Sequence, residues 1–406
     1  MISIVKKILY YSITRLARHL SPLKETTAIE ITPGLESIFV SLPLNFSRLP
    51  GKFATQFVAI KRIPARRIFI LKDVFVSGQA VIFKNLKIFK PSLPWLRDLH
   101  LYQDGRFLMQ QWLQKPFRKE NHHIVALIYD DWSAANYYHW MIEALPRLLL
   151  ARRRFPDCVF IVPEPAPEFI GATLNLLGVD MSLRLDRHSG KVLQASKLIM
   201  PELVYYYEVE YASPSKFNSI QTTSGNIPVP HSALKNLNES EELIFSVREL
   251  LLEKFESEAK LPHRKIFVSR SRQRTRKLQN EEDAWALLQE YGFERVFFED
   301  KTFNEQVHLM LDTTVLLSVH GANMVNMLFM PHGSTVIELM NEEYLNDAYY
   351  LLSSTCKLEY FSIPCKMADK SNKLTRDSVV LNDANLVVDT KYLKETLNMA
   401  LIKGGG

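Results

Sequence analysis

Two titratable side chains near the middle of the chain have the spacing of one helical face. His139 and Glu143 are four residues apart, and Asn136 lies three residues before the histidine. Residues three and four apart are neighbours on a helix surface. The helix is predicted to follow a buried strand at 123–130, so its polar face starts at the carboxyl end of that strand. His139 could act there as a general base, with Glu143 orienting the imidazole or coupling to its charge. By spacing alone, a core histidine with a satisfied hydrogen bond is the favoured alternative.

Two adjacent carboxylates end the same predicted strand. Asp130 and Asp131 could in principle bind a divalent cation. Two neighbouring aspartates are a weak metal signal, however, because Mg²⁺ usually needs substrate phosphate to complete its shell. Asp131 is therefore a candidate catalytic residue beside His139 and Glu143, and no metal site is predicted.

A second set of polar side chains follows the predicted strands between residues 264 and 340. Short apolar strands alternate there with amphipathic helices, which is typical of a parallel sheet with both faces covered. Arg270 follows the first strand, residues 320–323 follow the third, and Glu338 lies at the end of the last. Ligands of such sheets bind outside the carboxyl ends of the strands. This coincidence is the main functional signal in the sequence.

These strand ends suit an anionic ligand. An arginine just past a strand can make two charge-assisted bonds to a phosphate, and Arg276 is close by in the sequence; the alternative for Arg270 is a surface ion pair. Gly321 and Ala322 let a ligand approach the backbone, and the start of the following helix favours an anion, although a simple tight turn fits nearly as well. Glu338 could accept hydrogen bonds from a ribose diol, or cap or pair structurally. No GxGxxG or GxxxxGKS/T motif occurs, which argues against NAD(P) and P-loop ATP chemistry.

The composition is that of an ordinary globular chain with room for two domains. It has 406 residues, of which 47% are hydrophobic and 23% charged. The three cysteines lack metal-ligand spacing, and their small, odd number points to a reducing compartment. The formal net charge is +6, but basic residues gather only in short clusters such as 152–154 and 270–276, which argues against nucleic-acid binding.

The first 20 residues predict a basic amphipathic helix. Val5, Leu9 and Leu16 recur near helical spacing, with lysines and arginines between them. Such a helix can lie on an anionic membrane surface. Packing against its own protein is an equally good explanation. No apolar run reaches the ~18–20 residues that a membrane-spanning helix needs, and a signal peptide is not expected.

The predicted fold class is α/β, with two Rossmann-like domains facing across a cleft and a small β-rich N-terminal appendage. Ser133 is the predicted N-cap of the helix that carries His139, and Pro146 is expected to kink that helix. A loop at 205–231 is expected to determine substrate specificity. The predicted segments are the N-terminal helix and linker (1–32), a β-rich region with an antiparallel meander (33–120), a Rossmann-like domain with a linker helix (121–260), a second Rossmann-like domain (261–366), and a C-terminal loop and helix (367–406).

Two blocks of the sequence together resemble glycosyltransferase family 61. The first runs from Asn136-Tyr137-Tyr138-His139-Trp140 to Leu145-Pro146-Arg147-Leu148. The second keeps the order Val268-Ser269-Arg270, Asn280-Glu281, Glu305-Gln306, His320-Gly321-Ala322-Asn323, Asn326, Phe329, Gly333 and Val336-Ile337-Glu338. The ordered series is specific and spans about residues 120–340, whereas each piece by itself is weak. Asn323 departs from the family, which often has a small or apolar residue there, and this puts the type of donor in doubt.

The resemblance implies a GT-B architecture and an inverting transfer of sugar from a nucleotide sugar, usually without an essential metal. It assigns the nucleotide to the C-terminal domain and the acceptor to the N-terminal domain. Arg270 is then expected to hold the pyrophosphate, Glu338 to reach the ribose, and His139 to stand near the acceptor hydroxyl. The full set of implied donor-binding residues is Arg270, Arg276, His320, Gly321, Ala322, Asn323, Asn326 and Glu338.

The expected protein is a cytoplasmic, bacterial-type enzyme that builds a surface polysaccharide such as capsule or lipopolysaccharide. A UDP-sugar is the favoured donor, and no further cofactor is expected. The expected acceptor is a glycan or a lipid-linked glycan, and nucleic acid is not an expected partner. Residues 1–20 are the candidate for a peripheral contact with the inner face of the membrane. The alternative is a non-catalytic glycan-binding or scaffold protein on the same fold.

Overall fold

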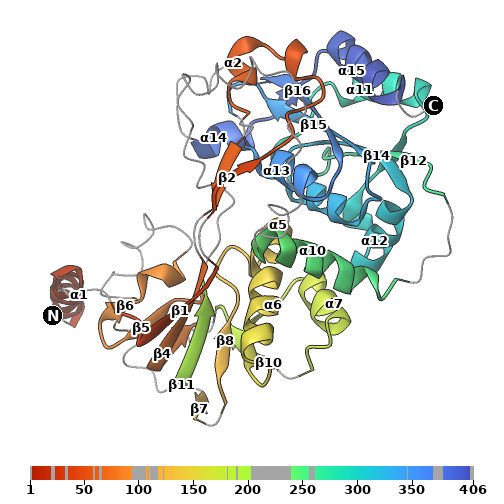
Figure 1. Ribbon diagram of the computed structural model, residues 1–406. Coiled ribbons are helices and arrows are strands. Elements are labelled where there is room, and N and C mark those ends of the chain that lie inside the picture. Colours follow the sequence, from red (N-terminus) through yellow and green to blue (C-terminus); the bar gives the residue numbers. More distant parts are fainter. Residues whose placement is uncertain are drawn as a thin grey trace. The chain divides into compact units, whose positions relative to one another are not determined.

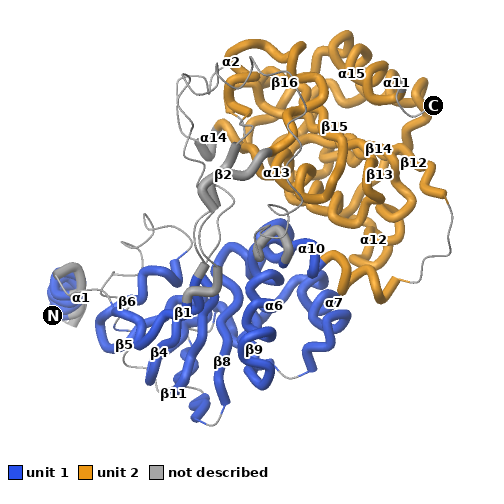
Figure 2. The backbone as a smooth tube through the Cα atoms, viewed as in Figure 1, with its two compact units in different colours: residues 1–34, 64–205, 238–247 blue, residues 35–63, 206–237, 248–406 orange. Residues whose placement is uncertain are grey.

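The computed structural model divides into two compact units. Unit 1 holds residues 1–34, 64–205 and 238–247, and unit 2 holds residues 35–63, 206–237 and 248–406 (Figure 2). Helices and strands are mixed in both units, which confirms the α/β class. The predicted specificity loop at 205–231 lies outside the described residues. Described are residues 2–19, 23–32, 35–57, 60–63, 66–93, 107, 109, 118–121, 123–180, 182–188, 191–202, 239–255, 261–344, 346–368 and 378–402.

Unit 1 is built on one large sheet. Its main path has the strand order β10-β9-β8-β11-β4-β5-β6, with β1 paired to β4 and β7 paired to β11 (Figure 1). The strands β8 to β11 pair in parallel, and β4 to β6 pair antiparallel. The strands of unit 1 are β1 (Thr27–Thr32), β4 (Arg66–Ser77), β5 (Ile82–Lys84), β6 (Lys87–Ile88), β7 (Arg118–Glu120), β8 (Val125–Leu127), β9 (Val159–Glu164), β10 (Ser182–Asp186) and β11 (Val192–Pro201).

Strands β4 to β6 of the β-rich N-terminal region belong to this sheet and do not form the separate appendage that the sequence predicts, whereas β2 and β3 form a ribbon of their own. β4 pairs with β11 from Ser77 opposite Val192 to Ile68 opposite Pro201. The longest strand of the sheet, β4, runs without a break over 12 residues. An unpaired edge of β11 would leave its buried N–H and C=O groups without partners, and β4 supplies those partners.

The helix that carries His139 begins three residues later than predicted. Asn136 caps α5 (Tyr137–His139), because its side chain accepts hydrogen bonds from the backbone N–H groups of Tyr138 and His139. A π-helical turn, η4 (Trp140–Ala144), then leads into α6 (Leu145–Arg154). Pro146 has no N–H for an ordinary helical bond, and its ring crowds the preceding turn. The wider π turn accommodates both effects, so the helix changes its winding just before the proline.

Unit 2 contains the three β–α units that the sequence predicts. Its main sheet has the order β13-β12-β14-β15-β16-β17, in which only β17 is antiparallel to its neighbour. Phe267, Leu317 and Ile337 lie side by side in its buried core, as expected for strands covered on both faces. The strands are β12 (Arg264–Val268), β13 (Glu294–Val296), β14 (Thr313–Val319), β15 (Thr335–Asn341), β16 (Glu359–Met367) and β17 (Leu386–Val387).

The helices of unit 2 follow these strands. The C-terminal helix α15 contributes Leu393 and Leu397 to the same core, so it packs on this unit. The elements after β12 are α11 (Glu281–Glu290), η5 (Phe298–Asp300), α12 (Phe303–Leu311), η6 (Ala322–Phe329), α13 (Ala348–Thr355), α14 (Ser378–Asp383) and α15 (Thr390–Ile402). The small ribbon β2 (Leu35–Phe39) with β3 (Ile60–Ile63), η1 (Phe46–Arg48) and α2 (Gly51–Ala54) also belong to unit 2.

The predicted N-terminal helix is α1 (Ile2–His19). Unit 1 also contains η2 (Lys90–Ser92) and α7 (Glu168–Leu176), and the unit boundary falls within α10 (Glu239–Leu252). Among the described residues, no helix combines the length and the apolarity that a membrane crossing requires.

The side chain of Asn45 bonds to the backbone of β16 in the unit 2 sheet. Its removal should destabilise the protein. Its amide donates to the carbonyl of Ser362 at 2.7 Å and accepts from the N–H of Ser362 at 3.2 Å, with the side chain 1% exposed. Asn45→Ala leaves these buried backbone groups unpaired, so the free energy of unfolding is expected to fall by about 2–4 kcal/mol. Urea unfolding measures this change. Asn398→Ala, which removes an exposed acceptor for Tyr291, is the control and is expected to cost less than about 1 kcal/mol; equal losses would contradict the assignment.

Candidate functional site

Three of the predicted donor-site residues lie at the same edge of the unit 2 sheet. Arg270 follows β12, His320 follows β14, and Glu338 lies within β15, level with Val268 and Ser318. The prediction that the strand ends at Glu338 is wrong, because β15 continues to Asn341. The strands are in register there, because Val268 pairs with Ser318 and Ser318 pairs with Glu338. The sheet therefore brings together side chains that are up to 68 residues apart, as the strand pattern predicts.

Arg270 is a buried cation that forms no ion pair with a carboxylate of the described residues. Arg270 is 8% exposed. None of the ion pairs between described residues includes its guanidinium. Its two hydrogen bonds are long, 3.5 Å each, to Oδ1 of Asn323 and to the carbonyl of Thr275, and its Nε has no partner. Burial lowers the pKa of Arg270 to about 10, and the nearby charge of Arg276 acts in the same direction. An anionic ligand would relieve both effects.

Gly321 makes room for this guanidinium. A Cβ atom at position 321 would overlap Nη1 and Cζ of Arg270. The glycine has extended backbone dihedrals that any residue can adopt, so the requirement concerns space and not conformation. Backbone and guanidinium therefore meet closely at the start of η6, which is where the sequence predicts an approach by phosphate.

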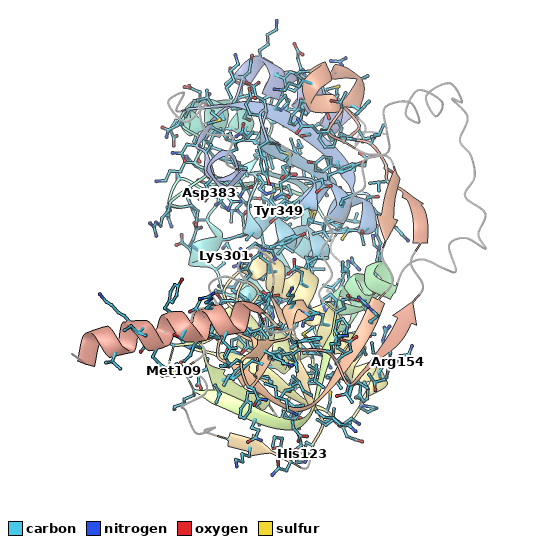
Figure 3. The ribbon with its side chains drawn as sticks, turned by 90° about the vertical axis from the view of Figure 1, so that its left-hand side faces the viewer. Met109, His123, Arg154, Lys301, Tyr349 and Asp383 are labelled. Atoms are coloured by element: carbon cyan, nitrogen blue, oxygen red, sulfur yellow. The ribbon has the colours of Figure 1, made fainter. Side chains whose placement is uncertain are left out.

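Glu338 holds His320 in place. Nδ1 of His320 lies 2.5 Å from Oε1 of Glu338, and the hydroxyl of Tyr360 donates to Oε2 at 2.6 Å. Glu338 is fully buried. The His320 ring packs against Tyr349, which is labelled in Figure 3, with ring centroids 5.0 Å apart. A carboxylate accepts hydrogen bonds, so Nδ1 of His320 carries the proton and Nε2 is the atom left for a ligand. The contact of Glu338 with a ribose stays a prediction.

A recess opens beside these groups within unit 2. Arg276, which borders it, lies 3.7 Å from Asp383 and is therefore partly neutralised, unlike Arg270. The lining includes amide side chains that can both donate and accept hydrogen bonds, as recognition of a polar ligand requires. Its polar lining consists of Arg276, His320, Asn341, Tyr344, Asn346 and Asn382.

The remaining predicted residues of this site lie on η6. Ala322 begins η6, and Asn323 contacts Arg270. Asn326 is fully buried, and its amide donates to Oε1 of Gln306 at 2.8 Å, which joins η6 to α12. A contact of Asn326 with a donor stays a prediction. The sequence pattern did not identify Tyr360, because its relation to Glu338 depends on the pairing of β16 with β15.

In unit 1, His139 and Glu143 form the predicted pair. Nδ1 of His139 lies 2.8 Å from Oε1 of Glu143, and the Trp132 ring packs on the imidazole with centroids 5.2 Å apart. Burial pulls the pKa of His139 down, but the hydrogen bond and charge of Glu143, with the charge of Asp130, outweigh it, so the pKa lies above the ordinary value. Burial raises the pKa of Glu143, against the opposing effect of His139. The imidazole is thus oriented by Glu143 with its second nitrogen directed away from that bond.

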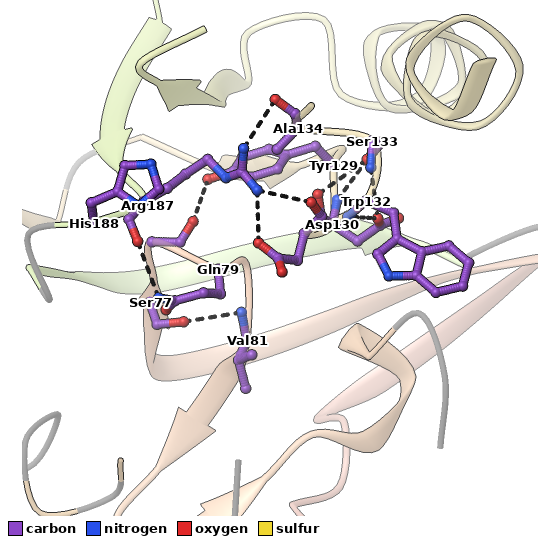
Figure 4. Close-up of polar contacts among 12 residues, drawn as sticks. Ser77, Gln79, Val81, Tyr129, Asp130, Trp132, Ser133, Ala134, Arg187 and His188 are labelled. Carbon is purple, nitrogen blue, oxygen red and sulfur yellow. Dashed lines mark hydrogen bonds and ion pairs between the residues drawn. The ribbon is translucent and has the colours of Figure 1, made fainter. Parts of the chain in front are cut away.

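The two aspartates shape the turn that leads to this helix (Figure 4). Oδ1 of Asp130 accepts from the N–H groups of Trp132 and Ser133, at 2.8 and 3.0 Å. Arg187 donates to both the carbonyl and Oδ1 of Asp131, each at 3.0 Å. The described residues contain no group of three His, Cys, Asp or Glu side chains placed to hold a metal ion. Arg187 directly follows β10, so the strand-end argument used for Arg270 would have found it.

Comparison with known proteins identifies a family. The model of the Glycosyltransferase 61 family matches residues 137–337, which include His139, Arg270, His320 and the start of β15. An EGF domain-specific O-linked N-acetylglucosamine transferase of Drosophila melanogaster is 31% identical over 100 residues, or 23% of this chain and 19% of that protein.

Two further relatives are forms of the protein O-linked-mannose beta-1,4-N-acetylglucosaminyltransferase 2. The Xenopus laevis protein is 33% identical over 96 residues, 22% of this chain and 16% of its own length. The human protein is 42% identical over 72 residues, 17% of this chain and 12% of its own length. The chain thus matches less than a fifth of each of these three relatives. Through residues 137–337, this chain belongs to the glycosyltransferase 61 family.

Proposed function

We propose that this protein is an inverting glycosyltransferase that takes its sugar from a nucleotide sugar, with the donor diphosphate bound at the carboxyl ends of β12 and β14. The observation that carries the proposal is the buried guanidinium of Arg270, which lies against Gly321 and pairs with no carboxylate of the described residues. The GT-B arrangement of the two units belongs to the same proposal.

The leaving group determines what unit 2 must supply. As the bond between the anomeric carbon and the diphosphate oxygen breaks, the electron pair stays on the diphosphate and its negative charge grows. Arg270 can donate two charge-assisted hydrogen bonds to that charge, and its place in a buried site strengthens them. Glu338 orients His320 through Nδ1, and Nε2 can donate to the diphosphate when the ring carries its second proton. These groups are positioned before the donor binds, so no reorganisation opposes the reaction.

The acceptor determines what unit 1 must supply. An acceptor hydroxyl forms the new bond to the anomeric carbon and loses its proton in the same step. We assign the base to His139, whose Nδ1 is taken by Glu143, so that Nε2 accepts the proton. The charge of Glu143 then stabilises the imidazolium that results. Asp131 is bound to Arg187 and is assigned to the turn and not to proton transfer.

The names of the relatives suggest the sugar. The fly, frog and human relatives are named for transfer of N-acetylglucosamine, so nucleotide-activated N-acetylglucosamine, as a UDP-sugar, is the first donor to test. Their names refer to EGF domains and O-linked mannose, whereas a capsular or lipopolysaccharide acceptor is an expectation from sequence alone. The acceptor therefore has to be found from a panel of glycans that includes both kinds.

A nucleotide panel tests the donor site directly. We expect one of UDP, GDP or CMP, or a sugar nucleotide built on it, to raise the melting temperature of the full chain, and the matching sugar to appear on an acceptor by mass spectrometry. Arg272→Ala is the matched control for Arg270→Ala, because Arg272 is exposed and pairs with Asp300 at 2.7 Å. Stabilisation should be lost in Arg270→Ala alone. If no nucleotide stabilises the protein, the donor site is refuted; binding without transfer to any acceptor would favour a non-catalytic role.

A further inference from the structure

The helix α1 carries an exposed apolar stripe. Val5 is 59% exposed, Leu9 44% and Leu16 51%, and Ile8 beside them is 61% exposed. Positions 5, 9 and 16 follow the i, i+4, i+11 spacing, which places them along one side of a helix. Aliphatic side chains gathered in this way on a surface mark a contact with another apolar phase or partner.

A different face of α1 holds the helix to unit 1. Ile13 packs, partly buried, against a cluster whose buried members are Val81, Phe83, Ile88, Leu93 and Val192. Thr14 is also half-buried, whereas Val5, Leu9 and Leu16 remain exposed. Packing of α1 on its own protein therefore accounts for Ile13 but leaves the stripe uncovered.

The charge of α1 indicates what covers the stripe. The sequence of the helix contains Lys6, Lys7, Arg15 and Arg18 and no aspartate or glutamate. Lys7 and Arg15 are exposed together with the apolar stripe. A second copy of α1 would bring like charges together, which opposes self-association through this face. An apolar interior bordered by negative charge is what a bilayer with acidic headgroups presents.

We propose that α1 docks in the plane of an anionic lipid surface, with Val5, Leu9 and Leu16 entering the acyl boundary and Arg15 at the phosphates. The long stem of Arg15, which flanks the stripe, lets its charge reach the headgroups while the stripe is buried. Lys7 lies on the opposite side of the helix and adds electrostatic attraction to the surface. The docking keeps unit 1 at a membrane. It is independent of the proposed sugar transfer, because no residue of the donor or acceptor site lies on α1.

Vesicle binding of the full chain tests this surface. We expect the protein to sediment with phosphatidylcholine vesicles that contain phosphatidylglycerol, and not with phosphatidylcholine alone. The triple change Val5→Ser, Leu9→Ser and Leu16→Ser should weaken the binding by more than about tenfold. Lys7→Glu with Arg15→Glu should weaken it about tenfold or more, and added salt should do the same.

Matched variants separate this surface from general effects. Leu261→Ser removes an apolar side chain that is 89% exposed in unit 2, and Lys391→Glu with Lys394→Glu reverses two exposed charges on α15. These controls should bind vesicles as the unchanged chain does, and circular dichroism should show that the α1 variants stay folded. The proposal is overturned if no vesicle binds the protein, if the α1 variants bind as well as the controls, or if the stripe variant instead abolishes a dimer in solution.

Discussion

His139→Ala is expected to lower sugar transfer by about 10²–10⁴-fold while nucleotide binding stays unchanged. The change removes the proposed base for the acceptor proton, and the expected loss is the contribution that general-base catalysis typically makes. Nucleotide binding should survive, because the proposed donor-site residues belong to unit 2 and His139 belongs to unit 1. Transfer is measured as initial rate at saturating donor, and binding as the shift in melting temperature. Full activity in His139→Ala would remove this residue as the base.

The pH dependence distinguishes a base from a merely structural histidine. His139 accepts a proton only when neutral, and its pKa is raised, so kcat/KM should fall as the pH drops through that raised value. Glu143→Gln keeps a hydrogen-bond acceptor beside Nδ1 but removes the charge that raises the pKa. Burial, which lowers the pKa, remains, and the acidic limb of the profile should therefore move to lower pH. An unchanged limb would show that another group titrates.

Gly321→Ala is expected to weaken nucleotide binding by about 10²-fold. The added methyl group overlaps Nη1 and Cζ of Arg270, so the guanidinium must move away from its position beside residue 321. Two charge-assisted hydrogen bonds to a phosphate contribute about 3 kcal/mol or more together, which corresponds to this change in affinity. Isothermal titration with the nucleotide identified in the panel measures it directly.

A second glycine provides the control for this substitution. Gly171 lies in α7 with open space around its Cβ position, so Gly171→Ala should leave binding intact. Arg270→Ala should lose at least as much affinity as Gly321→Ala, because it removes the cation outright. The assignment of Gly321 fails if its alanine variant binds nucleotide like the unchanged protein while Arg270→Ala does not.

The spacing of residues along the sequence was enough to predict much of the candidate site. The contact between His139 and Glu143 follows from four residues of helix and needs nothing distant. Arg270, His320 and Glu338 could be placed together because parallel strands joined by helices all end at one edge of their sheet. Several of the family motifs lie at these strand ends and occur in the same order along the sequence. Their order was therefore sufficient to identify the family.

Tertiary structure decided what each of these groups contacts. The Tyr360 hydroxyl reaches Glu338 only because β16 pairs beside β15, and Arg187 reaches Asp131 only because the end of β10 comes near the turn after β8. The spacing of apolar residues predicts a strand but not its neighbour in the sheet, which is why β4 was not expected on β11.

The role of Gly321 also depends on contacts that only the tertiary structure shows. Its sequence context predicted a close approach by a ligand, whereas the structure shows that the guanidinium of Arg270 occupies that space. Pairing and register are set by the packing of segments far apart in the chain, and no local pattern contains that information. The sequence alone therefore identified the chemical groups, and only the fold showed that Arg270 is a buried cation that pairs with no carboxylate in the described part of the chain.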